Sequence, residues 1–134
     1  MVKILVIGSG AREHAIIKSL NISKKEKRIF CLASNNNPGI SDICKEIKII
    51  DINDAQLIKD YSIKHNINIA IIGPENPLAY GVADSLWEAG IGVIGPKKNL
   101  AQIETSKSFT RKLLKEYKIP GCPKFKTFTN TEGC

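Results

Sequence analysis

The first twenty residues constrain the fold of this chain most strongly. Residues 2–7 form an apolar run rich in β-branched side chains, which ends at the turn Gly8-Ser9-Gly10. A helical pattern follows at once, with Ala15, Ile16 and Leu20 expected on its apolar face. A short apolar run closed by glycines is typical of a buried parallel strand. The turn offers backbone N–H groups and a helix N-terminus at the end of that strand, which favours binding of an anion such as phosphate.

Four more short apolar runs alternate with helical patterns. The expected strands cover residues 28–33, 47–50, 69–72 and 92–94. This alternation predicts an α/β fold, with a doubly wound, mainly parallel five-stranded sheet of the Rossmann-like kind and helices on both faces. A strand order of 3-2-1-4-5 would place the first and fourth strands beside the crevice where such sheets bind ligands.

Capping residues indicate where the helices begin. Asn53 is expected to cap a helix that runs from Asp54 to about His65. Pro77 suits the first position of another helix, which would end at Gly90. The side chains expected to face inward from these two helices are Leu57, Ile58, Tyr61, Leu78, Val82, Leu86 and Trp87.

The strand–helix alternation stops near residue 100. Two helical stretches follow, at residues 99–104 and 106–117, and residues 124–128 have the pattern of one more strand. We therefore expect a substrate-binding α/β domain at residues 1–100 and the beginning of a second domain at residues 101–134. The last residues show no strong signal for a completed element, so this second domain is expected to be truncated.

Composition argues against several kinds of partner. The chain of 134 residues carries a formal charge of +7, but its lysines are scattered and its aromatic residues are sparse, so we expect no nucleic-acid partner. No apolar run approaches the roughly 18 residues of a membrane span, and no signal sequence is evident, which predicts a cytoplasmic protein without a membrane partner. The four cysteines lack the spacing of a metal site, so no metal ligands are expected here.

Three loops are expected to meet at the crevice: the turn at residues 8–10 and the loops at residues 35–39 and 73–77. Glu75 is the sharpest candidate, because it follows a buried strand and lies between two prolines. Its carboxylate could accept hydrogen bonds from ribose hydroxyls or from an amine. The alternative is a solvated loop acid. A turn at Asn37-Pro38-Gly39 either offers amide donors or only reverses the chain.

The Gly8-x-Gly10 pair also begins a dinucleotide fingerprint, but two features oppose NAD or FAD. Glu13 stands where that fingerprint has its third glycine, and no acid follows the second strand to hold a ribose. A single phosphate on the turn fits better, and a turn that only joins strand to helix remains an alternative. Arg12, Glu13 and His14 either hold ribose or phosphate at the pocket rim or have structural roles, such as complementing the helix dipole.

Three segments together carry a resemblance to a known family. VKILVIGSGAREHA, IIGPENPLAYGVAD and GVIGPKKNLAQIETSKSF resemble the phosphoribosylamine–glycine ligases, also called glycinamide ribonucleotide synthetases, of the ATP-grasp superfamily. The similarity extends along the whole chain in order and with matching spacing. The REHA and GPE-x-PL signatures are specific in combination.

The resemblance implies an enzyme of purine biosynthesis that joins glycine to 5-phosphoribosylamine with ATP and Mg²⁺, through glycyl phosphate. It implies no NAD and no catalytic residue in this chain, and it assigns Lys107 of the Ser106-Lys107 pair to ATP phosphates; a solvated helix lysine is the alternative. The substrate-binding residues implied by the matching motifs are Gly8, Gly10, Arg12, Glu13, His14, Asn37, Gly39, Glu75 and Pro77.

Some features depart from the family pattern. Ala11 replaces a usual glycine, and residues 35–39 differ from the usual P-G-N-A-G loop, which leaves individual donors there open. Family members are much longer, so the ATP and Mg²⁺ sites should lie mostly after Cys134, and this chain alone should not catalyse the ligation. The alternatives are a binding module of the same fold without catalysis, a related ATP-grasp carboxylase or ligase, and an NAD-dependent oxidoreductase.

Overall fold

The computed structural model describes residues 1–128. Five parallel strands form one sheet in the order β3-β2-β1-β4-β5. This confirms the predicted α/β class and the predicted strand order. The strands are β1 (Val2–Ile7), β2 (Lys27–Ala33), β3 (Glu46–Ile49), β4 (Ile69–Ile72) and β5 (Gly92–Ile94). The helices are α1 (Ala11–Ile22), α2 (Pro38–Ser41), α3 (Ala55–His65), α4 (Glu75–Ala79), α5 (Val82–Glu88), α6 (Lys98–Thr105) and α7 (Lys107–Glu116).

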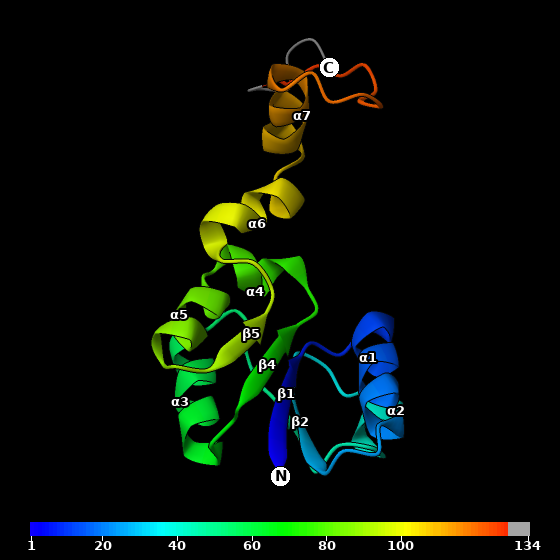
Figure 1. Ribbon diagram of the computed structural model, residues 1–134, viewed down its shortest axis with the longest axis vertical. Coiled ribbons are helices and arrows are strands. Elements are labelled where there is room, and N and C mark those ends of the chain that lie inside the picture. The colour runs from blue at the N-terminus through cyan, green and yellow to red at the C-terminus, as the bar shows by residue number, and fades with distance from the viewer. Residues whose placement is uncertain (129–134) are drawn as a thin grey trace.

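Helices cover both faces of the sheet (Figure 1), because side chains alternate between the two faces along each strand. In β1, Leu5 and Ile7 belong to the core shared with α3, α4 and α5. Ile4 and Val6 belong to the core on the opposite face, with α1 and α2. Each fully buried aliphatic side chain stabilises the fold by about 1.5–3 kcal/mol. The two cores therefore hold the sheet from both sides.

The strand register brings the carboxyl ends of three strands together. Ile7 of β1 lies opposite Leu32 of β2 and Ile72 of β4. The ladder continues one residue further on each side, since the Gly8 N–H donates to the Leu32 carbonyl at 2.8 Å and the Gly73 N–H donates to the Ile7 carbonyl at 3.1 Å. The loops after β1, β2 and β4 thus start side by side, as the strand order requires.

The single helix expected from Pro77 to Gly90 was a wrong prediction. Two helices occupy this stretch, and Gly81, with φ at +82°, separates α4 from α5. That left-handed backbone conformation, which favours glycine, ends the first helix. Pro77 lies at the third position of α4 rather than the first, because α4 begins at Glu75.

Three side chains predicted to face inward are exposed. Leu57 and Trp87 keep 39% and 45% of their surface accessible, and Ala15 is also exposed. In α1 the buried positions are Glu13 and Ile17, one helical turn apart, so the stripe that faces the sheet excludes Ala15. The apolar pattern located these helices and most of their buried side chains, such as Ile58 and Leu86, but wrongly included these three.

The start of α3 also differs from the prediction. The carboxylate of Asp54, not the side chain of Asn53, caps the helix by accepting the Leu57 N–H at 2.9 Å. We expect Asp54→Ala to lower the free energy of unfolding by about 1 kcal/mol, the usual loss for an N-cap. Asn53→Ala should change it by less than about 0.5 kcal/mol. Urea unfolding of both variants, followed by circular dichroism, tests this; equal losses would contradict the assignment.

Helices α6 and α7 extend away from the sheet (Figure 1). Helix α6 packs on α4, with Ala101 buried in the core, whereas α7 has no buried residue. Residues 124–128 lie in no strand, contrary to the prediction, and the remainder of the expected second domain, residues 129–134, lies outside the described part. Within residues 1–128, none of the helices combines the length and the apolar character needed to cross a bilayer.

Candidate functional site

A pocket of about 710 Å³ lies at the carboxyl end of the sheet. Its walls are residues 9–13 after β1, 34–35 after β2, 52–53 after β3 and 74–76 after β4. The strand order reverses here, between β1 and β4, and this place is called the switch point of the sheet. Open α/β sheets bind their ligands at such a point. Of the predicted site residues, the pocket wall includes Gly10, Arg12, Glu13 and Glu75.

Glu13 is the most buried charged residue of this pocket, with 3% of its surface exposed. Its Oε2 accepts the Gly10 N–H at 2.6 Å, which satisfies one free donor at the start of α1 and complements the helix dipole. Its Oε1 is buried and has no hydrogen-bond partner among the described residues. The nearest cation is Arg12, whose Nε lies 4.0 Å away. A buried acceptor without a partner costs about 1–3 kcal/mol.

Two glycines make room for the Glu13 side chain. A Cβ on Gly8 would lie 2.9 Å from both Glu13 and Pro74, and the φ of Gly8, +117°, also favours glycine. A Cβ on Gly73 would overlap the Glu13 carboxylate. Glu13 therefore fills the space that the third glycine of a dinucleotide fingerprint would leave open.

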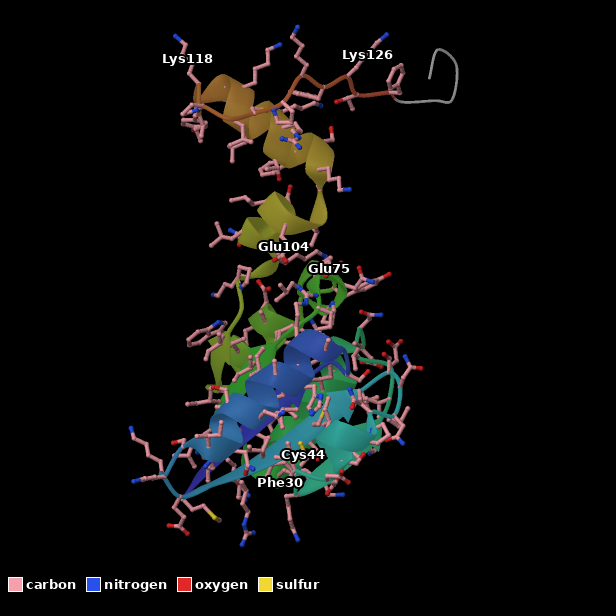
Figure 2. All side chains as sticks on the ribbon, turned by 90° about the vertical axis from the view of Figure 1, so that its right-hand side faces the viewer. Phe30, Cys44, Glu75, Glu104, Lys118 and Lys126 are labelled. Atoms are coloured by element: carbon pink, nitrogen blue, oxygen red, sulfur yellow. The ribbon has the colours of Figure 1, made fainter. Side chains whose placement is uncertain are left out.

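Arg12 and Glu75 connect the two sides of the switch point. The Arg12 Nη2 lies 3.5 Å from the Glu75 Oε2, which joins the start of α1 to the start of α4. Both side chains are largely exposed, so this ion pair contributes only about 0–1 kcal/mol to stability. Both groups can consequently turn toward a ligand at little cost. Figure 2 shows Glu75 at the end of the sheet domain from which α6 departs.

Asn37, Gly39 and His14 lie together behind the glycine turn. The Asn37 Nδ2 donates to the carbonyl oxygen of Ser9 at 3.0 Å. A Cβ on Gly39 would come within 2.5 Å of the His14 ring, so only glycine lets the ring pack there. These three residues and the buried Pro77 are outside the pocket wall.

Lys107 lies elsewhere. It is exposed at the start of α7 and lines a separate pocket of about 400 Å³ with Arg111 and Lys126. Lys126 is at the far end of the α6–α7 extension from Glu75 (Figure 2). The structure therefore does not bring Lys107 into the pocket at the switch point. Among residues 1–128, no three His, Cys, Asp or Glu side chains are grouped in a way that could hold a metal ion.

Comparison with known proteins assigns the family. The sequence profile described as "Phosphoribosylglycinamide synthetase, N domain" matches residues 2–104. The chain belongs to this family. It is 45% identical over 127 residues to the phosphoribosylamine–glycine ligase of Methanosarcina barkeri, covering 95% of this chain and 29% of that protein. It is 47% identical over 126 residues to the enzyme of Methanococcus vannielii, covering 94% and 28%. The chain thus spans less than a third of the length of these relatives.

Solved structures agree on the fold of this family. The phosphoribosylglycinamide synthetase of Anaerococcus prevotii superposes with a TM-score of 0.62 at 15% identity, over 87% of this chain and 29% of that one. The N5-carboxyaminoimidazole ribonucleotide synthetase of Thermotoga maritima gives 0.64 at 18% identity, over 90% and 32%. Identities this low establish only that the fold is shared with these two synthetases.

One part of the pocket wall, Ile52 and Asn53 in the loop after β3, was missed in the sequence. Asn53 was predicted to cap α3, but its side chain lines the pocket and its Oδ1 is buried without a partner among the described residues. The residues Asn53-Asp54 offer two adjacent capping candidates, and the sequence pattern does not distinguish which of them is free for another role. Only the structure identifies Asp54 as the cap, through the hydrogen bond that the Leu57 N–H donates to its carboxylate.

Proposed function

We propose that this chain forms the N-terminal part of a phosphoribosylamine–glycine ligase and that its switch-point pocket binds the phosphoribosyl substrate. The observation that carries the proposal is the pocket itself, in which the family's REHA and GPE-x-PL segments meet through Arg12 and Glu75. The complete enzyme would join glycine to 5-phosphoribosylamine at the expense of ATP, in purine biosynthesis. The named relatives, with 45–47% identity, support this activity.

The phosphate of the substrate would bind at the start of α1. Glu13 already takes the Gly10 N–H, so the phosphate would use the N–H groups of Ala11 and Arg12, which have no intrahelical acceptor in the first turn. The Arg12 guanidinium supplies a positive charge beside them, and its loose pairing with Glu75 lets it turn toward the phosphate. A carboxylate at Glu13 beside Gly8 and Gly73 also disfavours the close approach of a dinucleotide, which supports the expectation that NAD is not bound.

Glu75 would accept hydrogen bonds from ribose hydroxyls or from the substrate amine. Its carboxylate is half-exposed at the pocket wall, with Oε2 3.5 Å from the Arg12 Nη2. Asn37, Gly39, His14 and Pro77 would act indirectly, by fixing the loops that carry the contacting groups.

ATP would be bound mainly by the remainder of the enzyme. Lys107, Arg111 and Lys126 surround one surface pocket, and this concentration of positive charge is suited to a polyphosphate. ATP supplies the phosphoryl group that activates the glycine carboxylate. The residues described here do not suit Mg²⁺, and we propose no ligand for it among them. We also propose that residues 101–134 begin the ATP-grasp domain, which the outward course of α6 and α7 supports (Figure 1).

An NMR titration of the 134-residue chain tests the proposal. Glycinamide ribonucleotide, the stable product, is expected to shift the amide signals of Gly10, Arg12 and Glu75. Equal concentrations of NAD should leave them unchanged. Shifts produced by NAD but not by the ribonucleotide would contradict the ligase assignment and favour a dehydrogenase-like domain.

Replacing Glu75 by glutamine should weaken binding of glycinamide ribonucleotide about tenfold, the effect of losing one charged hydrogen-bond acceptor. The fold should persist because Glu75 is exposed and its ion pair contributes little. Isothermal titration calorimetry measures the affinity. Glu88→Gln, at the exposed end of α5, is the matched control. An unchanged affinity in Glu75→Gln would remove Glu75 from the binding site.

A further inference from the structure

Two buried side-chain oxygens in the described part of the chain have no hydrogen-bond partner, and both belong to residues of the same pocket. They are Oε1 of Glu13 and Oδ1 of Asn53. Folded proteins rarely leave buried acceptors unpaired, and each exception calls for an explanation such as a bound water, an ion or a functional role. Glu13 is enclosed by Gly8 and Gly73, whereas Asn53 is only partly buried. Asn53 is therefore the residue whose side chain a ligand in the pocket can contact, although its buried Oδ1 must turn toward that ligand.

The loop around Asn53 needs nothing from its side chain. The carboxylate of Asp51 accepts the Asn53 N–H at 2.9 Å and shapes the turn. Ile52 is buried in the core and anchors the loop, while Asp54 caps α3. The backbone of Asn53 is thus fixed from both sides, and its amide group is available for another purpose.

The topology places Asn53 where it can meet a ligand of the switch point. The chain leaves β3 at the edge of the sheet and must pass β2 and β1 to enter β4. The loop after β3 begins this crossing at the carboxyl ends of the strands. Asn53 consequently shares the pocket with Glu75, although their strands are separated by two others.

We propose that Asn53 determines specificity for the sugar, by accepting a hydrogen bond at Oδ1 from a hydroxyl of the bound phosphoribosyl ligand. The inference rests on the proposed function and adds a residue outside the recognised motifs. A neutral acceptor suits a sugar hydroxyl, which can donate a hydrogen bond, whereas the phosphate group of a sugar phosphate is mostly the dianion at neutral pH and has no proton to donate. The phosphate lies at the Arg12 side of the pocket, and the sugar hydroxyls reach toward Asn53.

Affinities for ribose 5-phosphate and for inorganic phosphate test this contact, measured with the 134-residue chain by NMR titration. Asn53→Ala should weaken binding of ribose 5-phosphate about tenfold and leave binding of inorganic phosphate unchanged within about twofold. Asn53→Gln retains a neutral amide acceptor and should recover part of the affinity for ribose 5-phosphate. Asn21→Ala, on the exposed end of α1, is the matched control.

The possible results separate this inference from the proposed function. Unchanged binding of ribose 5-phosphate by Asn53→Ala would overturn the role of Asn53 and leave the pocket assignment intact. An equal loss for ribose 5-phosphate and phosphate would indicate a general effect on the pocket and would also overturn the hydroxyl contact. No binding of either ribose 5-phosphate or glycinamide ribonucleotide by the unmodified chain would overturn both proposals.

Discussion

Replacing Gly73 by alanine is expected to destabilise the folded chain by about 3 kcal/mol, at the upper end of the usual cost of overpacking. The added methyl group would occupy the position of the Glu13 carboxylate. Glu13 cannot move aside easily, because its Oε2 holds the Gly10 N–H and its side chain also contacts Gly8. The Gly73 N–H is itself part of the sheet ladder, so the backbone resists displacement as well. Urea unfolding gives the loss directly.

A double-mutant cycle shows whether the clash with Glu13 causes this loss. In a Glu13→Ala background, Gly73→Ala should cost less than about 1 kcal/mol, because contacting residues couple by up to about 3 kcal/mol. Gly92→Ala is the matched control, since a Cβ there would meet nothing closer than 3.6 Å and that glycine has no unusual φ. A cost of Gly73→Ala that is the same in both backgrounds would mean that Glu13 does not fill this space.

The sheet could be predicted from the sequence because each of its strands is a short apolar run and glycines follow several of them directly. The apolar runs at residues 2–7 and 69–72 end at Gly8 and Gly73, and those glycines mark the two loops that flank the switch point. The strand order followed from the usual topology of alternating strands and helices, and the structure has that order. The side of α1 that faces the sheet was harder to predict, because this helix buries a glutamate. An acidic side chain such as Glu13 is usually found at the surface, and its burial here depends on Gly8 in the same segment and on the distant Gly73.

The location of the candidate site could be predicted from the sequence, but the residues that form its wall could not all be predicted. Motif residues such as His14, Asn37 and Gly39 matched the family, yet the structure places them behind the turn rather than in the pocket wall. Asn53 carries no motif and lies in the wall. Whether a side chain faces a pocket depends on the crossing of the β3–α3 loop over neighbouring strands, and local sequence patterns contain no information about that crossing.

Alkaline pH is expected to destabilise the chain strongly through a cysteine beneath the site. Cys31 in β2 is fully buried, and its thiol donates to the Gly8 carbonyl at 3.3 Å. Burial raises the pKa of the Cys31 thiol to about 12, with smaller contributions from Cys44 and from the Glu13 carboxylate. Burial likewise raises the pKa of Cys44 to about 11. In the unfolded chain both thiols would ionise near their ordinary pKa of 9.0.

The direction of this pH effect on stability depends on whether the folded or the unfolded chain retains the thiol protons. Above pH 9 the unfolded chain releases thiol protons that the folded chain retains, so unfolding becomes more favourable as the pH rises. The contribution of Cys31 is fully present below pH 9 and is lost at about 1.4 kcal/mol per pH unit, or about 4 kcal/mol by pH 12. Urea unfolding between pH 8 and pH 11 measures the slope.

Cys31→Ala separates this effect from the titration of lysines, which both proteins share. The variant should be less stable at pH 7, because it leaves a small cavity, yet its stability should fall less steeply above pH 9. Parallel slopes for the two proteins would contradict the role of Cys31. Ionisation of this thiol would also remove the donor that holds the Gly8 carbonyl and place a negative charge close to Glu13.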